Sequence, residues 1–250
     1  MTEIIAEIGL QHDGSLREAL AFVRACAKRG VDVVKFQCHL GDANAHFREG
    51  TEHHSPQDES RFRYWQRTGF QKHEWERIKQ ECDDCGVEFL CTPFSVAAAA
   101  ELINPLVKRW KIGSGSVQDA ELLSFVRKTE KPIIYSNGMR LPVHYELHEA
   151  GTLEMACISK YPTPLNEAMD LLNEVKHSVH WGWSSHTGTV ADSLDAIDAG
   201  ATAVEVHVCW HKEQGGPDVE SAIAVDELPL LTTLAGMQGR THEARVSAAV

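Results

Sequence analysis

Two lysines stand inside short apolar segments, where a charged side chain is unusual. Lys35 and Lys111 are each flanked by valine, isoleucine, phenylalanine or tryptophan. Burying an ammonium group is costly unless an anion meets it. The Gly-Ser-Gly segment 113–115 follows directly after Lys111, and such a segment can offer backbone N–H groups to phosphate oxygens. The pattern predicts an anionic, phosphate-bearing ligand, with structural ion pairs to Glu7 or Glu205 as the alternative.

Two histidines end neighbouring apolar segments near the C-terminal part of the chain. They are His186 and His207. Imidazole nitrogens at equivalent strand ends can converge on one divalent metal ion. His211 follows four residues later and is more typical of a loop residue. The spacing therefore favours a two-histidine metal site beside the predicted anion site.

Short apolar segments alternate with amphipathic ones along the whole chain. The amphipathic segments have apolar residues at helical spacing, and Ser15 with Glu18 forms a capping box at the first of them. We expect strands at 4–8, 31–37, 87–91, 108–112, 132–135, 153–158, 179–183 and 202–208. We expect helices at about 16–29, 71–85, 95–103, 118–128, 142–150, 165–176, 189–199 and 226–238.

Eight strand–helix units in roughly 240 residues predict an α/β protein with a closed (β/α)8 barrel, the TIM barrel. A doubly wound open sheet is the alternative, but no GxGxxG follows the first strand. We expect a single barrel domain over 1–240 and a C-terminal tail over 241–250. Residues 38–70 form one long inserted loop, which is typical of a substrate lid or an interface.

The composition excludes several classes of protein. Lys and Arg number 24 against 36 Asp and Glu, which gives a net charge of −12. A nucleic-acid-binding surface needs a basic face, so we expect no nucleic-acid partner. No apolar run is long enough to span a membrane, and the N-terminus has no signal-peptide pattern. The seven cysteines are scattered, Cys82 and Cys85 included, which favours reduced thiols and a cytoplasmic protein.

In such a barrel, chemistry takes place just past the C-terminal ends of the strands. The segments there, in this order over about residues 3–230, resemble the N-acetylneuraminate (sialic acid) synthase family. The matching segments are Ala6-Glu7-Ile8-Gly9 with His12 and Gly14, Val34-Lys35-Phe36-Gln37, Thr92-Pro93-Phe94, Lys111-Ile112-Gly113-Ser114-Gly115, Ser136 with Gly138 and Met139, Tyr161-Pro162-Thr163-Pro164, His186-Thr187, Glu205 with His207, and Gly216-Pro217-Asp218 before Asp226-Glu227-Leu228.

The resemblance implies a transferase of carbohydrate biosynthesis. Members of the family are barrels that condense phosphoenolpyruvate with an aldehyde sugar, and they release phosphate and a nonulosonic 2-keto acid. They use a divalent metal, for which we expect Mn²⁺, with Mg²⁺ or Co²⁺ as alternatives, and they imply a homodimer.

The resemblance also implies roles for individual residues. The catalytic set would be Glu7, Lys35, Lys111 and Tyr161. The substrate-binding set would be Thr92, Ser114, Gly115, Ser116, Ser136, Ser159, Ser184 and Asp218. His186 and His207 would hold the metal.

The chain departs from the family pattern at several points. Ser116 stands where the family has an acidic residue, and Ser185 stands where the family has the aspartate of Ser-Asp-His-Thr. We expect no counterpart of the family's C-terminal antifreeze-like domain, which in the family helps to cover the partner subunit's site. The phosphoenolpyruvate residues and both metal histidines are retained, so the pattern predicts an altered acceptor.

Two other functions remain open at this stage. One is another phosphoenolpyruvate aldol synthase that makes a seven- or eight-carbon keto acid from a phosphorylated aldose, with Arg48, Arg61 and Arg63 as candidate phosphate ligands. The other is a catalytically dead barrel that binds a sugar or phosphate ligand, for which Ser116 and Ser185 are the best support. The retained lysines and histidines argue against a binding-only barrel.

Overall fold

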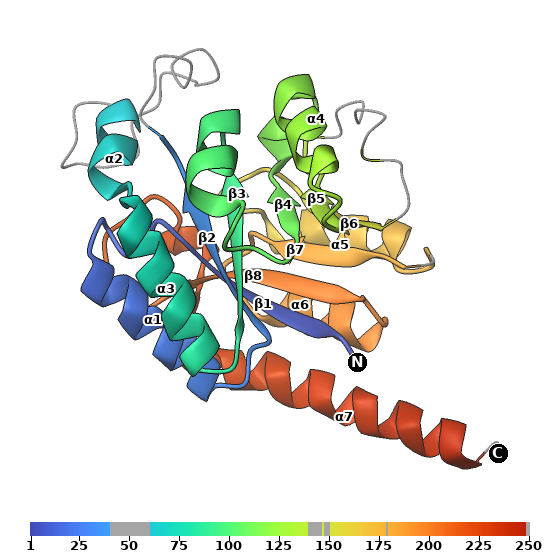
Figure 1. Ribbon diagram of the computed structural model, residues 1–250. Helices are drawn as coiled ribbons and strands as arrows, with labels where there is room; N and C mark the ends of the chain where they lie inside the picture. The colour runs from blue at the N-terminus through green and yellow to red at the C-terminus, as the bar shows by residue number, and fades with distance from the viewer. Residues whose placement is uncertain (41–60, 140–146, 148–150, 179, 249–250) are drawn as a thin grey trace.

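Figure 1 shows the computed structural model, which describes residues 1–40, 61–139, 147, 151–178 and 180–248, with no side-chain description for 61–62 and 239–248. Eight parallel strands lie side by side in the order β3-β2-β1-β8-β7-β6-β5-β4, and β3 also lies next to β4, so the sheet curls into a nearly closed barrel. The strands are β1 (Glu3–Gly9), β2 (Val33–Cys38), β3 (Glu88–Pro93), β4 (Trp110–Ile112), β5 (Ile133–Ser136), β6 (Thr152–Ala156), β7 (Gly182–Ser185) and β8 (Ala203–Cys209). A two-residue strand, β9 (Ile223–Ala224), pairs with β8.

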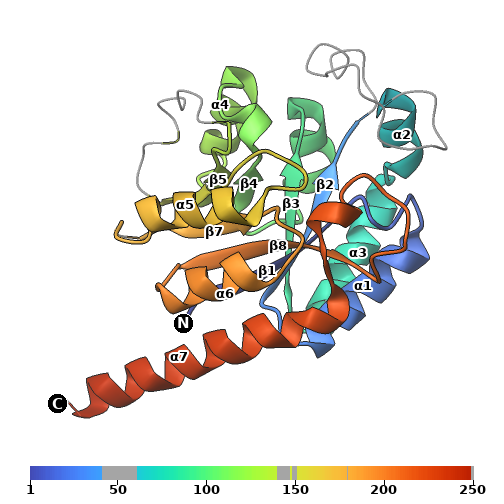
Figure 2. The same ribbon diagram turned by 180° about the vertical axis from the view of Figure 1, so that it is seen from behind.

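Helices surround the strands on the outside of the barrel (Figures 1 and 2). They are α1 (Leu16–Lys28), α2 (Arg61–Thr68), α3 (Lys72–Asp84), a π-helix (Ala98–Ile103), α4 (Ala120–Lys128), α5 (Leu165–Val175), α6 (Ala191–Asp198) and α7 (Leu228–Ala248). All eight expected strands are present, so the (β/α)8 prediction is confirmed and the open-sheet alternative is wrong. The helix expected at 142–150 lies outside the described residues, apart from Leu147.

Three segments differ from the sequence-based expectations. The helix expected at 95–103 is largely a π-helix, in which the Asn104 N–H bonds to the Ala99 carbonyl, because helix propensity alone cannot separate i−4 from i−5 hydrogen bonding. The expected loop 38–70 contains α2, whose Tyr64 and Thr68 are buried. Helix α7 runs to Ala248, ten residues beyond the expected end, and projects past the barrel (Figure 2).

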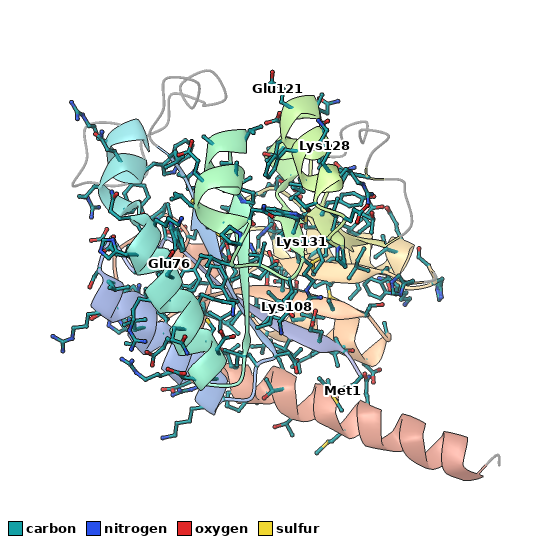
Figure 3. The ribbon with its side chains drawn as sticks, viewed as in Figure 1. Met1, Glu76, Lys108, Glu121, Lys128 and Lys131 are labelled. Carbon is teal, nitrogen blue, oxygen red and sulfur yellow. The ribbon has the colours of Figure 1, made fainter. Side chains whose placement is uncertain are left out.

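The division into a barrel domain to residue 240 and a tail from 241 stays a prediction, and α7 runs across that boundary. None of the helices formed by the described residues is both long and apolar enough to cross a membrane. Charged side chains such as Glu76, Glu121 and Lys128 lie on the outer faces of α3 and α4 (Figure 3).

The first helix shows how the sequence fixes local structure. The Ser15 side chain accepts a hydrogen bond from the Glu18 N–H, which caps the helix as the capping-box pattern predicts. Phe22, Val23 and Cys26 form the buried face of α1 against the strands. Gly30 ends the segment at φ +80°, a conformation that favours glycine.

The barrel interior is layered, because side chains on a strand alternate with a period of two. One apolar layer fills the lower interior and consists of Ile5, Val33, Leu90, Ile134, Met155 and Ala203. Two residues further along five of these strands the side chains are polar: Glu7, Lys35, Thr92, Ser136 and Glu205. The apolar layer is therefore the base on which the polar end of the barrel rests.

The loop after β1 packs through His12, which is 1% exposed. Its ring stacks on Phe70 with centroids 4.5 Å apart, and its Nδ1 accepts a hydrogen bond from the Gly14 N–H at 3.1 Å. Burial lowers the pKa of His12 to about 3. The imidazole is therefore neutral in the folded protein near pH 7.

This burial gives a pH dependence of stability. Unfolded His12 takes up a proton near pH 6.5, whereas the folded protein resists protonation until about pH 3. Between these values the unfolded state binds more protons, so the free energy of unfolding falls as the pH decreases. We expect His12→Gln to reduce the slope of this loss by up to about 1.4 kcal/mol per pH unit. Urea unfolding of both proteins between pH 7 and 4.5 measures it, and identical slopes would contradict the assignment.

Candidate active site

A pocket of about 450 Å³ opens at the C-terminal ends of the strands. This volume is in the range of small-molecule sites. Its lining residues are Glu7, Lys35, Gln37, Thr92, Phe94, Lys111, Gly113, Ser114, Gly115, Ser136, Met139, Ser159, Tyr161, Ser184, His186, Glu205 and His207. A second pocket, between α5 and α6, lies on the outside of the barrel and contains none of the expected site residues.

Four buried charges form the floor of the pocket. The Lys35 Nζ lies 2.9 Å from Glu7 Oε2 and 3.4 Å from Glu205 Oε1. The Lys111 Nζ lies 3.7 Å from Glu205 Oε2. Each of these side chains is at most 4% exposed. The two lysines therefore form the ion pairs that were the alternative interpretation. Both lysines also line the pocket, so the ion pairs do not exclude an anion-binding site.

The two lysines differ in their electrostatic balance. Burial lowers the pKa of Lys111, and the single carboxylate of Glu205 does not compensate. Burial also acts on Lys35, but Glu205 and Glu7 together raise its pKa above the usual value. Burial alone would raise the pKa of Glu205, but Lys111 and Lys35 hold that pKa well below its usual range. With both carboxylates ionised and both lysines protonated, the floor carries no net charge.

A wall of hydroxyl groups continues from this floor. The Lys111 ammonium donates to Ser136 Oγ at 2.6 Å, and Lys35 donates to Thr92 Oγ1 at 3.3 Å. The Ser184 hydroxyl donates to Glu205 Oε1 at 3.2 Å. These hydroxyls lie against the charged groups, where they can also reach a bound anion.

Gly138 packs against the serine side chains of this wall. Its N–H donates to Ser114 Oγ at 2.9 Å. A Cβ at this position would lie 2.5 Å from Ser159 Oγ and 2.7 Å from Cys157 Sγ, so no side chain fits here. The glycine, which follows β5, therefore leaves room for Ser114 after β4 and Ser159 after β6 in the same pocket.

The two histidines lie together in β8 and directly after β7, the strands that also carry Glu205 and Ser184. Their ring centroids are 5.4 Å apart. The His186 Nδ1 is 2.6 Å from the Ile158 carbonyl, to which it must donate, so its Nε2 is left as an acceptor toward the Tyr161 hydroxyl at 3.0 Å. Burial, with His207 close by, lowers the pKa of His186 to about 3. His186 is thus a neutral imidazole with Nε2 facing the pocket.

A divalent metal fits the chemistry of this pair. A ligating histidine is commonly oriented by a carbonyl on its other nitrogen, as Ile158 orients His186. The His207 Nδ1 is buried without a hydrogen-bond partner and lies 3.8 Å from Asp218 Oδ2. Within the described residues, no three His, Cys, Asp or Glu side chains are grouped as a metal site. The described part of the chain therefore offers these two imidazoles as the metal donors.

Most of the expected site residues line this one pocket, while two do not. Asp218 lies beside it, near His207 and Gly9. Ser116 is buried in the turn Ser114–Ser116 and does not reach the cavity surface. The roles assigned to all these residues stay predictions.

The Ser185 side chain points away from the pocket. Its hydroxyl lies 3.3 Å from Thr187 Oγ1, and Thr187 donates to the buried Asp192 Oδ1 at 2.8 Å. Trp183 donates to the other oxygen of the same carboxylate. Serine at position 185 therefore removes no carboxylate from the described cavity wall, and this departure gives no support to an altered acceptor.

Three lining residues were not assigned a role by the sequence. Gln37, Phe94 and Met139 belong to the matched motifs but were quoted only as part of them. The sequence could have predicted that Gln37 lines the pocket, because it follows Lys35 by two residues and so lies on the same face of β2. Phe94 and Met139 lie past the strand ends, where no periodicity applies.

The chain is similar to several known proteins. A model described as the NeuB family matches residues 22–237. The N,N'-diacetyllegionaminic acid synthase of Campylobacter jejuni is 31% identical over 254 residues, covering 93% of this chain and 75% of that protein. The N-acetylneuraminate-9-phosphate synthase of Drosophila melanogaster is 29% identical, covering 92% of this chain and 66% of that protein.

A solved structure shares the fold. The N-acetylneuraminic acid synthetase of Leptospira borgpetersenii superposes with a TM-score of 0.78 at 24% identity, covering 94% of this chain and 83% of that chain. The present chain spans between 66% and 75% of the length of the two curated relatives. The family match extends over most of the barrel, including the strands that carry the lysines and the histidines. The chain therefore belongs to the NeuB family of phosphoenolpyruvate-condensing sugar acid synthases.

Proposed function

We propose that this protein condenses phosphoenolpyruvate with an aldehyde sugar and forms a nonulosonic, sialic-like 2-keto acid plus phosphate in a reaction that needs a divalent metal. The observation that carries the proposal is the pair of buried lysines, Lys35 and Lys111, beside a wall of serine and threonine hydroxyls. Such a set of donors suits a ligand with both a carboxylate and a phosphate group.

The charge of the floor supports the need for a metal. Glu7 and Glu205 already neutralise the two lysines, so a ligand with several negative charges would enter a buried site without excess positive charge. Uncompensated charge in such a site is costly. A divalent cation held by His186 and His207 would supply the missing charge and, when bound, would polarise the aldehyde of the acceptor. Mn²⁺ is our choice by family resemblance, with Mg²⁺ or Co²⁺ as alternatives.

The bond changes are those that the family resemblance implies. The C2–C3 double bond of phosphoenolpyruvate opens as C3 bonds to the aldehyde carbon, and the aldehyde oxygen takes up a proton. Water adds at C2 and loses one proton, and the C2–O bond to phosphate then breaks as the new C2 hydroxyl gives its proton to the departing phosphate and becomes the keto group. Lys35 and Lys111 with Ser136 would hold the anionic groups throughout, since preorganised charges need no reorganisation. Glu7, ion-paired with Lys35, would accept hydrogen bonds from acceptor hydroxyls, and the Tyr161 hydroxyl would close the side next to His186.

The acceptor is proposed to differ from a standard acetamido sugar. Ser116 supports this, because the family carries an acidic residue at that position, although Ser116 itself lies under the pocket surface. A phosphorylated aldose is the second candidate, which the name of the Drosophila relative favours. The arginines expected to bind the acceptor phosphate receive little support. Arg48 and the side chain of Arg61 lie outside the described residues. Arg63 donates to Gln66 on an exposed face.

We also propose a homodimer and a cytoplasmic location. The first rests on resemblance to the family. The second rests on the seven cysteines, which are all free thiols in the structure, as is usual for proteins kept in a reducing compartment.

The first test is phosphate release from phosphoenolpyruvate with Mn²⁺ and a panel of aldehyde sugars. The panel includes N-acetylmannosamine, its 6-phosphate, a 2,4-diacetamido-6-deoxy aldose and unacetylated aldoses. We expect release that depends on one sugar, because C3 has no electrophile without it. Phosphoenolpyruvate binding without release from any sugar would contradict the enzyme and favour the binding-only barrel.

Substitutions in the floor test the anion site. We expect Lys111→Met to lower kcat/KM for phosphoenolpyruvate by about 30-fold or more, since truncating one partner of a buried charge pair costs at least about 2 kcal/mol. Lys108→Met, which changes an exposed lysine three residues earlier, is the matched control. Because Lys111→Met also leaves Glu205 with one partner fewer, Ser136→Ala is made alongside, with an expected KM increase of about 5-fold. If both variants fold and neither changes the KM for phosphoenolpyruvate, the proposal that these residues bind the anion is wrong.

A further inference from the structure

His39 follows β2 directly and is enclosed by two aromatic rings. Its ring stacks on Phe94 with centroids 4.0 Å apart and an interplanar angle of 12°. Its other side stacks on Trp65 of α2 at 4.1 Å and 16°. The side chain is 6% exposed and does not line the pocket, whereas Phe94 does. The sandwich therefore fixes both the plane of the imidazole and one ring of the pocket wall.

A directional chain of hydrogen bonds runs from His39 to the charged floor. The His39 Nε2 lies 3.1 Å from Gln37 Oε1, and the Gln37 Nε2 donates to Glu7 Oε1 at 2.9 Å. Glu7 Oε2 is in turn paired with Lys35. Because an amide oxygen can only accept, the hydrogen in the first bond must sit on the His39 Nε2. The His39 donor and the Glu7 acceptor thus favour the same orientation of the Gln37 amide.

The amide lies where polar atoms converge beside the pocket. A Cβ built on Gly9 would lie 3.3 Å from Gln37 Nε2, 3.4 Å from Glu7 Oε1 and 3.7 Å from Asp218 Oδ2. If the Gln37 amide turned over, its oxygen would face the Glu7 carboxylate, and two acceptors would meet without a hydrogen between them. The Glu7 carboxylate therefore opposes this turn, and the hydrogen on His39 Nε2 opposes it as well, because it would meet the amide N–H₂ unless it moved to Nδ1.

We propose that His39 is a positioning residue for the sugar acceptor, which acts by holding the Gln37 amide, and through it the Glu7 carboxylate, in one orientation. The inference rests on the proposed function. The hydrogen bonds from His39 reach the phosphoenolpyruvate side of the pocket only through the ion pair of Glu7 with Lys35, whereas Lys111 and Gly138 donate to Ser136 and Ser114 farther along the wall. Loss of His39 should therefore affect the acceptor more than phosphoenolpyruvate.

Three variants separate hydrogen bonding from packing. His39→Phe keeps a flat ring between Trp65 and Phe94 but removes the donor. His39→Gln can place an amide N–H near the original Nε2 and serves as the conservative rescue. Trp65→Leu keeps the donor but removes one stacking partner, and so reports the cost of packing alone.

Steady-state kinetics with the sugar identified by the panel give the first readout. We expect His39→Phe to raise KM for the sugar about 10-fold, in line with a lost hydrogen bond to a charged network, with KM for phosphoenolpyruvate within 2-fold. His39→Gln should recover part of this loss. Trp65→Leu should lower the melting temperature without a comparable change in KM. Equal increases in both KM values, in proportion to lost stability, would overturn the inference.

A second readout does not depend on turnover. In protein labelled with ¹⁵N-histidine, long-range ¹H–¹⁵N spectra show which ring nitrogen carries hydrogen, and His39→Phe identifies the signal. We expect hydrogen on Nε2 of His39, with a shift change in Gln37→Met. A bare Nε2 would overturn the inference whatever the activity. If no sugar is turned over, the proposed function fails. The NMR signal of His39 Nε2 then still tests whether the hydrogen-bond chain exists.

Discussion

Four buried charges at the end of the barrel constrain the rest of the structure. Removing Lys35, Lys111, Glu7 and Glu205 from water carries a large desolvation cost, which is recovered only if the charges stay paired and hydrogen-bonded. The strand register provides this, because Glu7 stands opposite Lys35 on the β1–β2 pair and opposite His207 on the β1–β8 pair. The apolar layer one period below keeps that register fixed. The site is therefore as rigid as the barrel itself.

The same pairing limits what the pocket can do alone. A neutral floor holds a polyanion less well than two free ammonium groups would, so the geometry favours a ligand that arrives together with a cation. The neutral imidazole of His186, held by the Ile158 carbonyl, is suited to receive that cation. Anion binding and metal binding are in this sense one property of the pocket, because β8 carries both Glu205 and His207.

The sequence predicted the barrel well because each strand is a short apolar run with a helix after it. It also predicted the pocket residues, since the C-terminal strand ends of a barrel meet in space. Helix α2 was missed because its polar composition resembles a loop, and its packing depends on contacts with distant segments, such as the stack of Trp65 on His39. The π-helix after β3 was missed because an alanine-rich run suits either helix type.

Two details of the site differ in whether the sequence could have predicted them: the direction of the Ser185 side chain and the role of His39. The period of two along β7 puts Ser184 and His186 on one face and Ser185 on the other, so the outward direction of Ser185 was available from the sequence. The role of His39 was not, because Trp65 and Phe94 approach it from separate elements. Strand periodicity thus identifies inward residues, while the groups that orient them depend on tertiary contacts.

The most direct test of this account is calorimetric binding of phosphoenolpyruvate to metal-stripped protein and to protein saturated with Mn²⁺. We expect Mn²⁺ to lower the dissociation constant of phosphoenolpyruvate by about 10-fold or more. Because coupling between two ligands is reciprocal, phosphoenolpyruvate should lower the dissociation constant of Mn²⁺ by the same factor. Equal affinity for phosphoenolpyruvate with and without the metal would contradict the claim that the paired floor needs a cation to accept its anion.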